Sequence, residues 1–203
     1  FQPVEDAKSK LLDLLSLPPE RSIIGHFARF HPMKDQERLV RAVKELLDEG
    51  HDVQGLFVGA GHVDGAVRQI AGELGIDSRI STLGVRDDVA NLMPGLDVYA
   101  LPSAWGEAFP LAVGEAMASG IPAVVTDVGD CSWLAGDTGA IVPPRDTDAL
   151  VVALKGMLDL GEQGRRELGL RARQRVIENF SLQQYVERHT ALYEKALAAS
   201  PPR

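Results

Sequence analysis

The sequence predicts an α/β protein with a doubly wound parallel sheet, helices on both faces of that sheet and extra helices at the carboxyl terminus. Two observations carry this prediction. Short runs rich in β-branched residues alternate with longer amphipathic stretches along most of the chain, which is the pattern of parallel strands joined by crossover helices. Several of the short runs are apolar with little polar alternation, as expected of strands that are buried on both faces.

The predicted elements follow in chain order. A helix over 5–15 is stopped by Pro18 and Pro19, and helices over 35–49 and 63–74 each gather their apolar residues on one face. Another helix begins near Pro110. The six predicted strands are 22–28, 53–59, 79–83, 97–101, 121–126 and 139–143.

After Pro143 and Pro144 the chain is predicted to be helical throughout, over 146–160, 162–179 and 181–198. Ser181 is a suitable amino-terminal cap for the last of these helices, because its hydroxyl can accept a hydrogen bond from a free backbone N–H. We expect residues 1–203 to form a single domain.

Composition excludes several classes of protein. The chain has 203 residues, of which 45% are hydrophobic and 25% charged, and its formal net charge is −8. An acidic chain lacks the long-range field that attracts nucleic acid, so any phosphate ligand must be held by a few local groups. The single Cys131 offers neither an internal disulfide nor a structural zinc site. No apolar run is long enough to cross a bilayer and no leader is visible. We therefore expect a cytoplasmic protein and, since Phe1 is not a natural start, a piece of a longer chain.

The most informative segment is 101–120, LPSAWGEAFPLAVGEAMASG. A strand ends at Leu101, a loop with proline and glycine follows, and Pro110 is expected in the first helical turn. Ligands of parallel sheets bind beyond the carboxyl ends of the strands. The free N–H groups of Phe109, Leu111 and Ala112, together with the helix dipole, would there form an anion site.

Two glutamates flank this helix start, and their residue types allow two interpretations. Ionised Glu107 and Glu115 could each accept hydrogen bonds from neighbouring hydroxyls, as in a ribose or a sugar ring. Alternatively, Glu107 caps the helix and Glu115 lies on a solvated face.

Two cations, Arg29 and Lys34, follow the first strand in a loop bent by Pro32. Because this loop opens on the same edge of the sheet, the cations could face a phosphate at the helix start and stabilise a diphosphate leaving group. A solvated basic loop is the alternative interpretation.

Several motifs together resemble the group 1, or family four, glycosyltransferases. The resemblance runs from about Ile23 to the last helix, and several motifs occur in the order and spacing of the family. The segments that carry it are Arg29-Phe-His-Pro-Met-Lys34, Val58-Gly59-Ala60-Gly61, Gly106-Glu107-Ala-Phe109-Pro110, Glu115-Ala116-Met117-Ala118-Ser119-Gly120-Ile-Pro122, Val124-Val125-Thr126-Asp127-Val128-Gly129 and Thr138-Gly139 with Val142-Pro143-Pro144.

The resemblance implies the GT-B fold, in which two Rossmann-like domains face each other across a cleft. This chain resembles the carboxy-terminal, donor-binding domain, and 181–203 resembles the helix that returns to the missing amino-terminal acceptor domain. The implied activity is a retaining transfer of sugar from a nucleotide-diphosphate donor to a hydroxyl, in polysaccharide or glycolipid biosynthesis. The isolated chain is expected to bind donor but to turn over little. Peripheral association of the full-length protein with the inner face of a membrane is left open.

The resemblance also implies roles for individual residues, and no metal or other cofactor. Arg29 and Lys34 match the cations that hold the diphosphate, and Glu107 the residue that contacts the hydroxyls of the transferred sugar. Glu115 matches the glutamate that binds the ribose. The donor is also expected to contact Gly59 and, in the base-binding loop, Val85. At the helix start it is expected to contact Phe109, Pro110 and Leu111.

One segment departs from the family pattern. Many relatives carry a glutamate shortly after the glycine-rich turn where this chain reads Gly129-Asp130-Cys131-Ser132-Trp133. A GT-B epimerase, a phosphorylase and a non-catalytic nucleotide-sugar module are the alternative functions. A phosphorylase would need a cofactor-bearing lysine motif that is not visible, and a non-catalytic module would not need all four charged residues.

Overall fold

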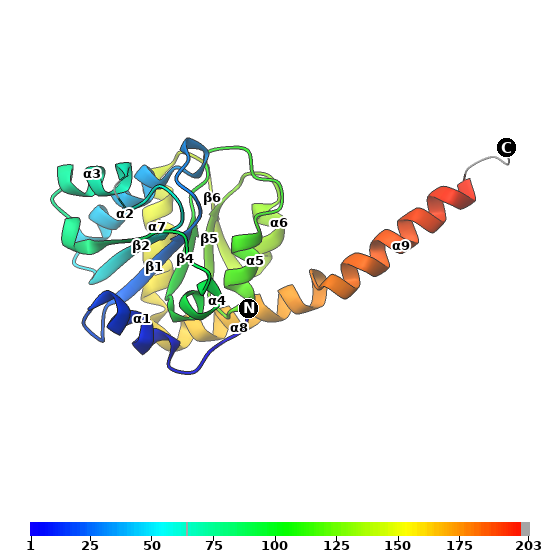
Figure 1. Cartoon of the computed structure of the whole chain (residues 1–203), viewed down its shortest axis with the longest axis horizontal. Coiled ribbons are helices and arrows are strands. Elements are labelled where there is room, and N and C mark those ends of the chain that lie inside the picture. Colours follow the sequence, from blue (N-terminus) through cyan, green and yellow to red (C-terminus); the bar gives the residue numbers. More distant parts are fainter. Residues whose placement is uncertain (64, 200–203) are drawn as a thin grey trace.

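The computed structural model describes residues 1–63 and 65–199. Its centre is one parallel sheet of six strands in the order β3-β2-β1-β4-β5-β6, flanked by helices on both sides (Figure 1). The doubly wound α/β fold predicted from the sequence is thereby confirmed. The strands are β1 (Ser22–Phe27), β2 (Val53–Val58), β3 (Ile80–Leu83), β4 (Val98–Leu101), β5 (Ala123–Thr126) and β6 (Gly139–Val142).

The central strands are apolar because both of their faces are covered. Every residue of β2, β4 and β5 is buried, as the lack of polar alternation in these runs predicts. β1 pairs in parallel with β2 from Ser22 opposite Val53 to Phe27 opposite Val58. On its other side β1 pairs with β4, with Ile24 opposite Val98.

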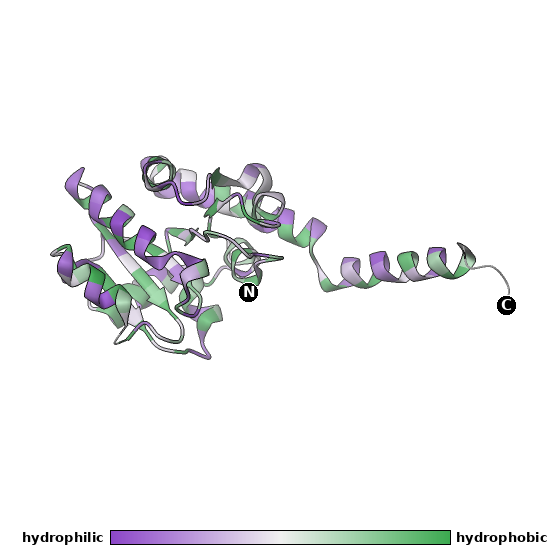
Figure 2. Cartoon of the chain, turned by 90° about the horizontal axis from the view of Figure 1, so that it is seen from above, coloured by the Kyte–Doolittle hydropathy of each residue, from purple (hydrophilic) through white to green (hydrophobic). Residues whose placement is uncertain are grey.

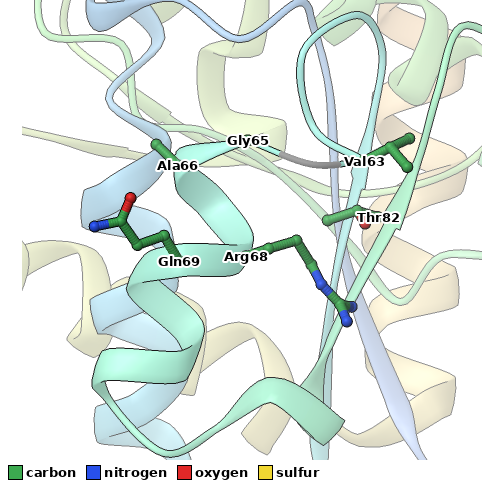
Figure 3. A pocket seen from close by; sticks show the side chains of 6 residues that line it. All are labelled: Val63, Gly65, Ala66, Arg68, Gln69 and Thr82. Atoms are coloured by element: carbon green, nitrogen blue, oxygen red, sulfur yellow. The ribbon is translucent and has the colours of Figure 1, made fainter.

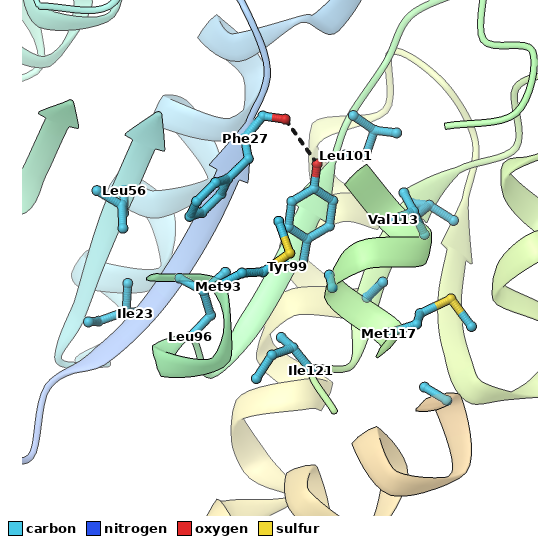
Figure 4. Packing of buried hydrophobic residues seen from close by; sticks show 14 of the residues in the cluster. Ile23, Phe27, Leu56, Met93, Leu96, Tyr99, Leu101, Val113, Met117 and Ile121 are labelled. Atoms are coloured by element: carbon cyan, nitrogen blue, oxygen red, sulfur yellow. Dashed lines mark hydrogen bonds between the residues drawn. The ribbon is translucent and has the colours of Figure 1, made fainter. Parts of the chain in front are cut away.

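Each face of the sheet has its own hydrophobic core. One core packs α2 (Gln36–Asp48), α3 (Ala66–Glu73) and α7 (Thr147–Asp159) against the sheet. The opposite core involves α1 (Ala7–Leu15), α4 (Val89–Leu92), α5 (Leu111–Ala118), α6 (Cys131–Ala135) and α8 (Gly161–Asn179). Figure 4 shows part of this second core, in which the buried Tyr99 hydroxyl donates a hydrogen bond to the carbonyl of Phe27 at 3.4 Å.

The differences from the sequence prediction concern short elements and boundaries. α4 and α6 were not predicted because one helical turn is too short to show a period of 3.6 residues. The same holds for the 3₁₀ turns η1 (Pro32–Lys34), η2 (Asp77–Arg79), η3 (Met93–Gly95) and η4 (Gly136–Thr138). The helix predicted over 63–74 begins only at Ala66, and position 64 within that range lies outside the described residues.

The last helix, α9 (Leu182–Ala199), extends away from the rest of the molecule (Figure 1). Its predicted cap is confirmed, since the Ser181 hydroxyl accepts a hydrogen bond from the N–H of Gln184 at 3.3 Å. Hydrophobic and hydrophilic residues alternate along it (Figure 2), and large apolar side chains are exposed: Leu182, Tyr185, Val186, Leu192, Tyr193 and Leu197. Over the described residues, no helix combines the length and the apolar character that crossing a bilayer requires.

Candidate functional site

The strand order places the candidate site at the carboxyl ends of β1 and β4. These two strands are neighbours in the sheet, but β1 is followed by α2 on one face and β4 by α5 on the other. Because the chain leaves the two strands in opposite directions, this is the switch point of the sheet, where ligands of doubly wound folds bind. We call the region between the two loops the crevice. The two loops are 28–35 and 102–110, which contain most of the predicted site residues.

Lys34 and Glu107 meet directly in this crevice. The Lys34 Nζ lies 2.5 Å from Glu107 Oε1, and their side chains are only 16% and 6% exposed. The Ser103 hydroxyl donates to the same carboxylate oxygen. The sequence predicted both charged residues at this edge but neither their ion pair nor the contribution of Ser103. Glu107 Oε2 is left without a partner among the described residues, so this oxygen can accept hydrogen bonds from a ligand.

The start of α5 supplies free backbone donors. The first helical residue is Leu111, and Pro110 precedes it as an extended cap whose carbonyl accepts from the N–H of Val113 at 3.0 Å. The expectation that Pro110 lies in the first turn is therefore wrong by one position, since its ψ of 97° is not helical. The N–H groups of Leu111 and Ala112 have no acceptor among the described residues, as expected at a helix start. They favour an anion at this point.

Glu115 lies on the second turn of α5 and is half-buried. Within the described part of the chain, its carboxylate makes no hydrogen bond or ion pair. Burial raises the pKa of Glu115 above its usual range, because the charged form has lost solvation and the positive amino terminus of Phe1 offsets that loss only in part. Hydroxyl donors from a ligand would restore that lost solvation, so the geometry fits a residue that binds hydroxyls.

Arg29 and Gly59 lie where the first two strands end. The Arg29 side chain is exposed and, across residues 1–63 and 65–199, pairs with no carboxylate. The neighbouring Phe30 N–H donates to the carbonyl of Ala60 at 2.7 Å, which joins the loops after β1 and β2. Gly59 has a φ of 139°, and a side chain there would overlap the carbonyl of Ala28. The structure thus gives Gly59 a role in loop packing, and its contact with a donor stays a prediction.

Val85 lies apart from this crevice. It follows β3, one of the two edge strands, and 79% of its surface is exposed. Beside this loop is an open cavity of about 610 Å³ between β3 and the start of α3, lined by Val63, Gly65, Ala66, Arg68, Gln69 and Thr82 (Figure 3). Gly84 is adjacent to Val63, so the loop predicted to contact the base borders a space that could hold one.

An aromatic cluster, which the sequence did not predict, lies next to the start of α5. Phe109 packs edge-on against Trp133, with 6.1 Å between ring centroids, and both rings pack on Phe180 at the end of α8. Trp133 is 52% exposed and Phe109 37%. Cys131, in contrast, is buried, and burial raises the pKa of its thiol to about 12, which is typical of a structural rather than a reactive cysteine.

His26 is fully buried within β1, as expected of a core residue, and burial lowers its pKa to about 3. In the unfolded chain its pKa returns to about 6.5. Above pH 6.5 His26 is neutral in both states and does not change the free energy of unfolding. Below pH 6.5 the unfolded state binds a proton that the folded state excludes. Stability is therefore lost progressively as the pH falls from 6.5 towards 3.

We expect His26 alone to reduce the free energy of unfolding by about 2 kcal/mol between pH 7 and pH 5. Urea titrations at the two pH values measure this difference. His26→Gln should lower stability at pH 7 but show a smaller loss on acidification, whereas His51→Gln, outside the sheet, should keep the wild-type loss. An unchanged loss in His26→Gln would contradict the assignment.

Comparisons with known proteins agree with this fold. The family model for group 1 glycosyl transferases matches residues 21–159. The chain is 36% identical over 172 residues to the MMP alpha-(1->4)-mannosyltransferase of Mycolicibacterium hassiacum, covering 82% of this chain and 41% of that protein.

Two solved structures are similar over nearly the whole chain. Sucrose-phosphate synthase from Thermosynechococcus elongatus is 31% identical with a TM-score of 0.83, and the match covers 98% of this chain and 50% of the synthase. Anabaena HepE in complex with UDP and glucose is 25% identical with a TM-score of 0.82, covering 94% of this chain and 54% of HepE. The chain thus spans about half or less of the length of these proteins. It belongs to the group 1 glycosyltransferase family.

Proposed function

We propose that this chain binds the nucleotide-diphosphate part of a sugar donor and serves in retaining transfer of that sugar to a hydroxyl acceptor, in polysaccharide or glycolipid biosynthesis. The observation that carries the proposal is the Lys34–Glu107 pair beside the free N–H groups at the start of α5. Family membership supports it, as does a similar protein that binds UDP and glucose. The buried single cysteine fits a cytoplasmic setting.

In this proposal the diphosphate lies against the start of α5. Lys34, Arg29 and the N–H groups of Leu111 and Ala112 stabilise the negative charge that develops on the diphosphate as the bond to the sugar breaks. These groups supply fixed positive charge at the site, so we propose that donor binding needs no metal ion. Glu107 uses its free Oε2 to hold hydroxyls of the transferred sugar, and Glu115 holds the ribose.

The exposed apolar face of α9 supports a second domain as part of the same enzyme. The relatives are about twice as long as this chain, and α9 has charges of both signs, Glu187, Arg188, Glu194 and Lys195, between its apolar residues. We propose that α9 packs on the acceptor-binding domain of the full-length protein. Proteolysis should then cut α9 quickly in this chain and slowly in the full-length protein, and equal rates would contradict the proposal.

Calorimetric titration of UDP and GDP into the chain tests donor binding. We expect one of the two nucleotides to bind, and Glu115→Ala to weaken that binding by roughly 10- to 100-fold, because hydrogen bonds to a charged group are worth about 1.5–3 kcal/mol. Glu45→Ala, on the exposed face of α2, is the matched control and should bind as the wild type does. Binding that is indifferent to both Glu115→Ala and Arg29→Ala would contradict the proposed function.

A further inference from the structure

The loop that carries Arg29 and Lys34 is hydrogen-bonded to a buried glutamine, Gln36, which has no role in the mechanism proposed above. Gln36, the first residue of α2, is 1% exposed. Its amide nitrogen donates to the carbonyl of Arg29 at 2.9 Å and lies 3.2 Å from Nε2 of His26. Its amide oxygen accepts from the N–H of His31 at 3.4 Å. One side chain therefore holds the backbone at two points between Arg29 and Lys34.

The protonation of His26 fixes the orientation of this amide. His26 Nδ1 lies 2.9 Å from the carbonyl of Ala100, which can only accept, so Nδ1 carries the proton. Burial keeps the ring neutral, and Nε2 is therefore an acceptor. Gln36 must direct its NH₂ group towards His26 and Arg29 and its oxygen towards His31. Every polar atom of the Gln36 side chain then has a partner, which a glutamate or a methionine could not achieve.

The loop is also hydrogen-bonded to the neighbouring loops. The N–H of Phe30 donates to Ala60, and the carbonyl of Met33 accepts from the N–H of Ala104 at 2.8 Å. These bonds tie the loop to its neighbours after β2 and β4, and Lys34 is further held by Glu107. The peptide unit between Arg29 and Phe30 is therefore held at its N–H by Ala60 and at its carbonyl by Gln36, whereas the side chain of Arg29 has no partner among the described residues.

We propose that Gln36 is a positioning residue that aims Arg29 at the diphosphate of the donor. The proposal rests on the proposed function, since it takes a diphosphate to be the ligand of the crevice. Gln36 contacts no ligand itself. It acts through Arg29, whose carbonyl it holds, and a misdirected Arg29 would lose the short charge-assisted contacts that distinguish a diphosphate from a monophosphate.

A double-mutant cycle between Gln36 and Arg29 tests this coupling, with UDP and UMP (or GDP and GMP, whichever base binds) as ligands. Gln36→Met keeps the length and burial of the side chain but removes all its hydrogen bonds. We expect it to weaken diphosphate binding about tenfold and monophosphate binding less than about threefold. In the Arg29→Met background, Gln36→Met should weaken diphosphate binding less than about twofold, because the guanidinium that Gln36 positions is absent.

Gln54→Met is the matched control. Gln54 is also a buried glutamine, 2% exposed, and donates to Ser81 Oγ at 2.9 Å, but it lies in the first half of β2, away from the crevice. It should lower the melting temperature without changing the ratio of diphosphate to monophosphate affinity. If Gln36→Met does not fold, Gln36→Asn carries the same cycle, since it keeps the amide but withdraws it by one methylene.

Amide hydrogen exchange gives a readout without ligand. The N–H of His31 should exchange faster in Gln36→Met than in the wild type, while that of Ala104 should not change. Equal losses of diphosphate affinity in the wild-type and Arg29→Met backgrounds would overturn the positioning role but leave the proposed function intact. If the wild type binds no nucleoside diphosphate, the proposed function and this role both fail, and the exchange rate of His31 would show only that Gln36 holds the loop.

Discussion

Lys34→Met should weaken binding of a nucleoside diphosphate roughly 100-fold. Lys34 is the cation that the structure places against the buried Glu107 at the mouth of the crevice. Its loss removes a charge-assisted contact to phosphate, worth about 2–3 kcal/mol. It also leaves the Glu107 carboxylate, 6% exposed, with only the Ser103 hydroxyl as a partner. Breaking a buried pair in this way is strongly destabilising, by about 3 kcal/mol or more.

Two further variants separate the effects on binding and folding. Adding Glu107→Gln to Lys34→Met removes the unpaired charge, so most of the lost stability should return while nucleotide affinity stays low. Lys155→Met breaks an exposed ion pair with Glu49 and should change neither quantity measurably. Calorimetry and urea unfolding measure the two quantities. A Lys34→Met variant that binds the nucleotide within twofold of the wild type would contradict the role of Lys34.

Gly129→Ala should disturb the donor site, although Gly129 itself is not one of the site residues. Gly129 follows β5 with a φ of 55°, and a Cβ at this position would overlap the carbonyl of Glu107. The adjacent Asp130 N–H donates to the carbonyl of Ala108 at 3.0 Å, so the two loops are in direct backbone contact. A side chain would push the Glu107 segment and the start of α5 away from the crevice. We expect a stability loss of about 2–4 kcal/mol and at least tenfold weaker nucleotide binding.

Gly75→Ala separates steric overlap from backbone strain. Gly75 has a φ of 68°, but no atom lies within 4 Å of a Cβ at this position. It should therefore lose only the roughly 1 kcal/mol that a left-handed backbone costs an alanine, with nucleotide affinity unchanged. If Gly129→Ala resembles Gly75→Ala in both measurements, the contact between the two loops does not support the site.

The sequence was sufficient to predict the sheet and the edge of the sheet at which the candidate site residues lie. Strands buried on both faces appear as apolar runs, and the switch-point rule then selects the loops after β1 and β4. Arg29, Lys34, Glu107 and Glu115 could be chosen because their charges stand out at that edge. The family resemblance added their roles.

The interactions within the site could not be predicted in the same way. The Lys34–Glu107 pair joins residues 73 positions apart in the chain, and the contact of Gly129 with Glu107 depends on loop geometry that has no periodic signal. The sequence does not single out Gln36, which lies within a predicted amphipathic helix, because its partners His26 and Arg29 come together only through the fold. The apolar face of α9 can be recognised in the sequence, but the sequence does not show that this face is exposed to solvent.

A crystal structure of this chain with the bound nucleoside diphosphate tests the central claim most directly. The account predicts density for the two phosphates at the N–H groups of Leu111 and Ala112, with Lys34 and Arg29 turned towards them and the ribose at Glu115. Density for the nucleotide at another place on the molecule, with the start of α5 unoccupied, would contradict it.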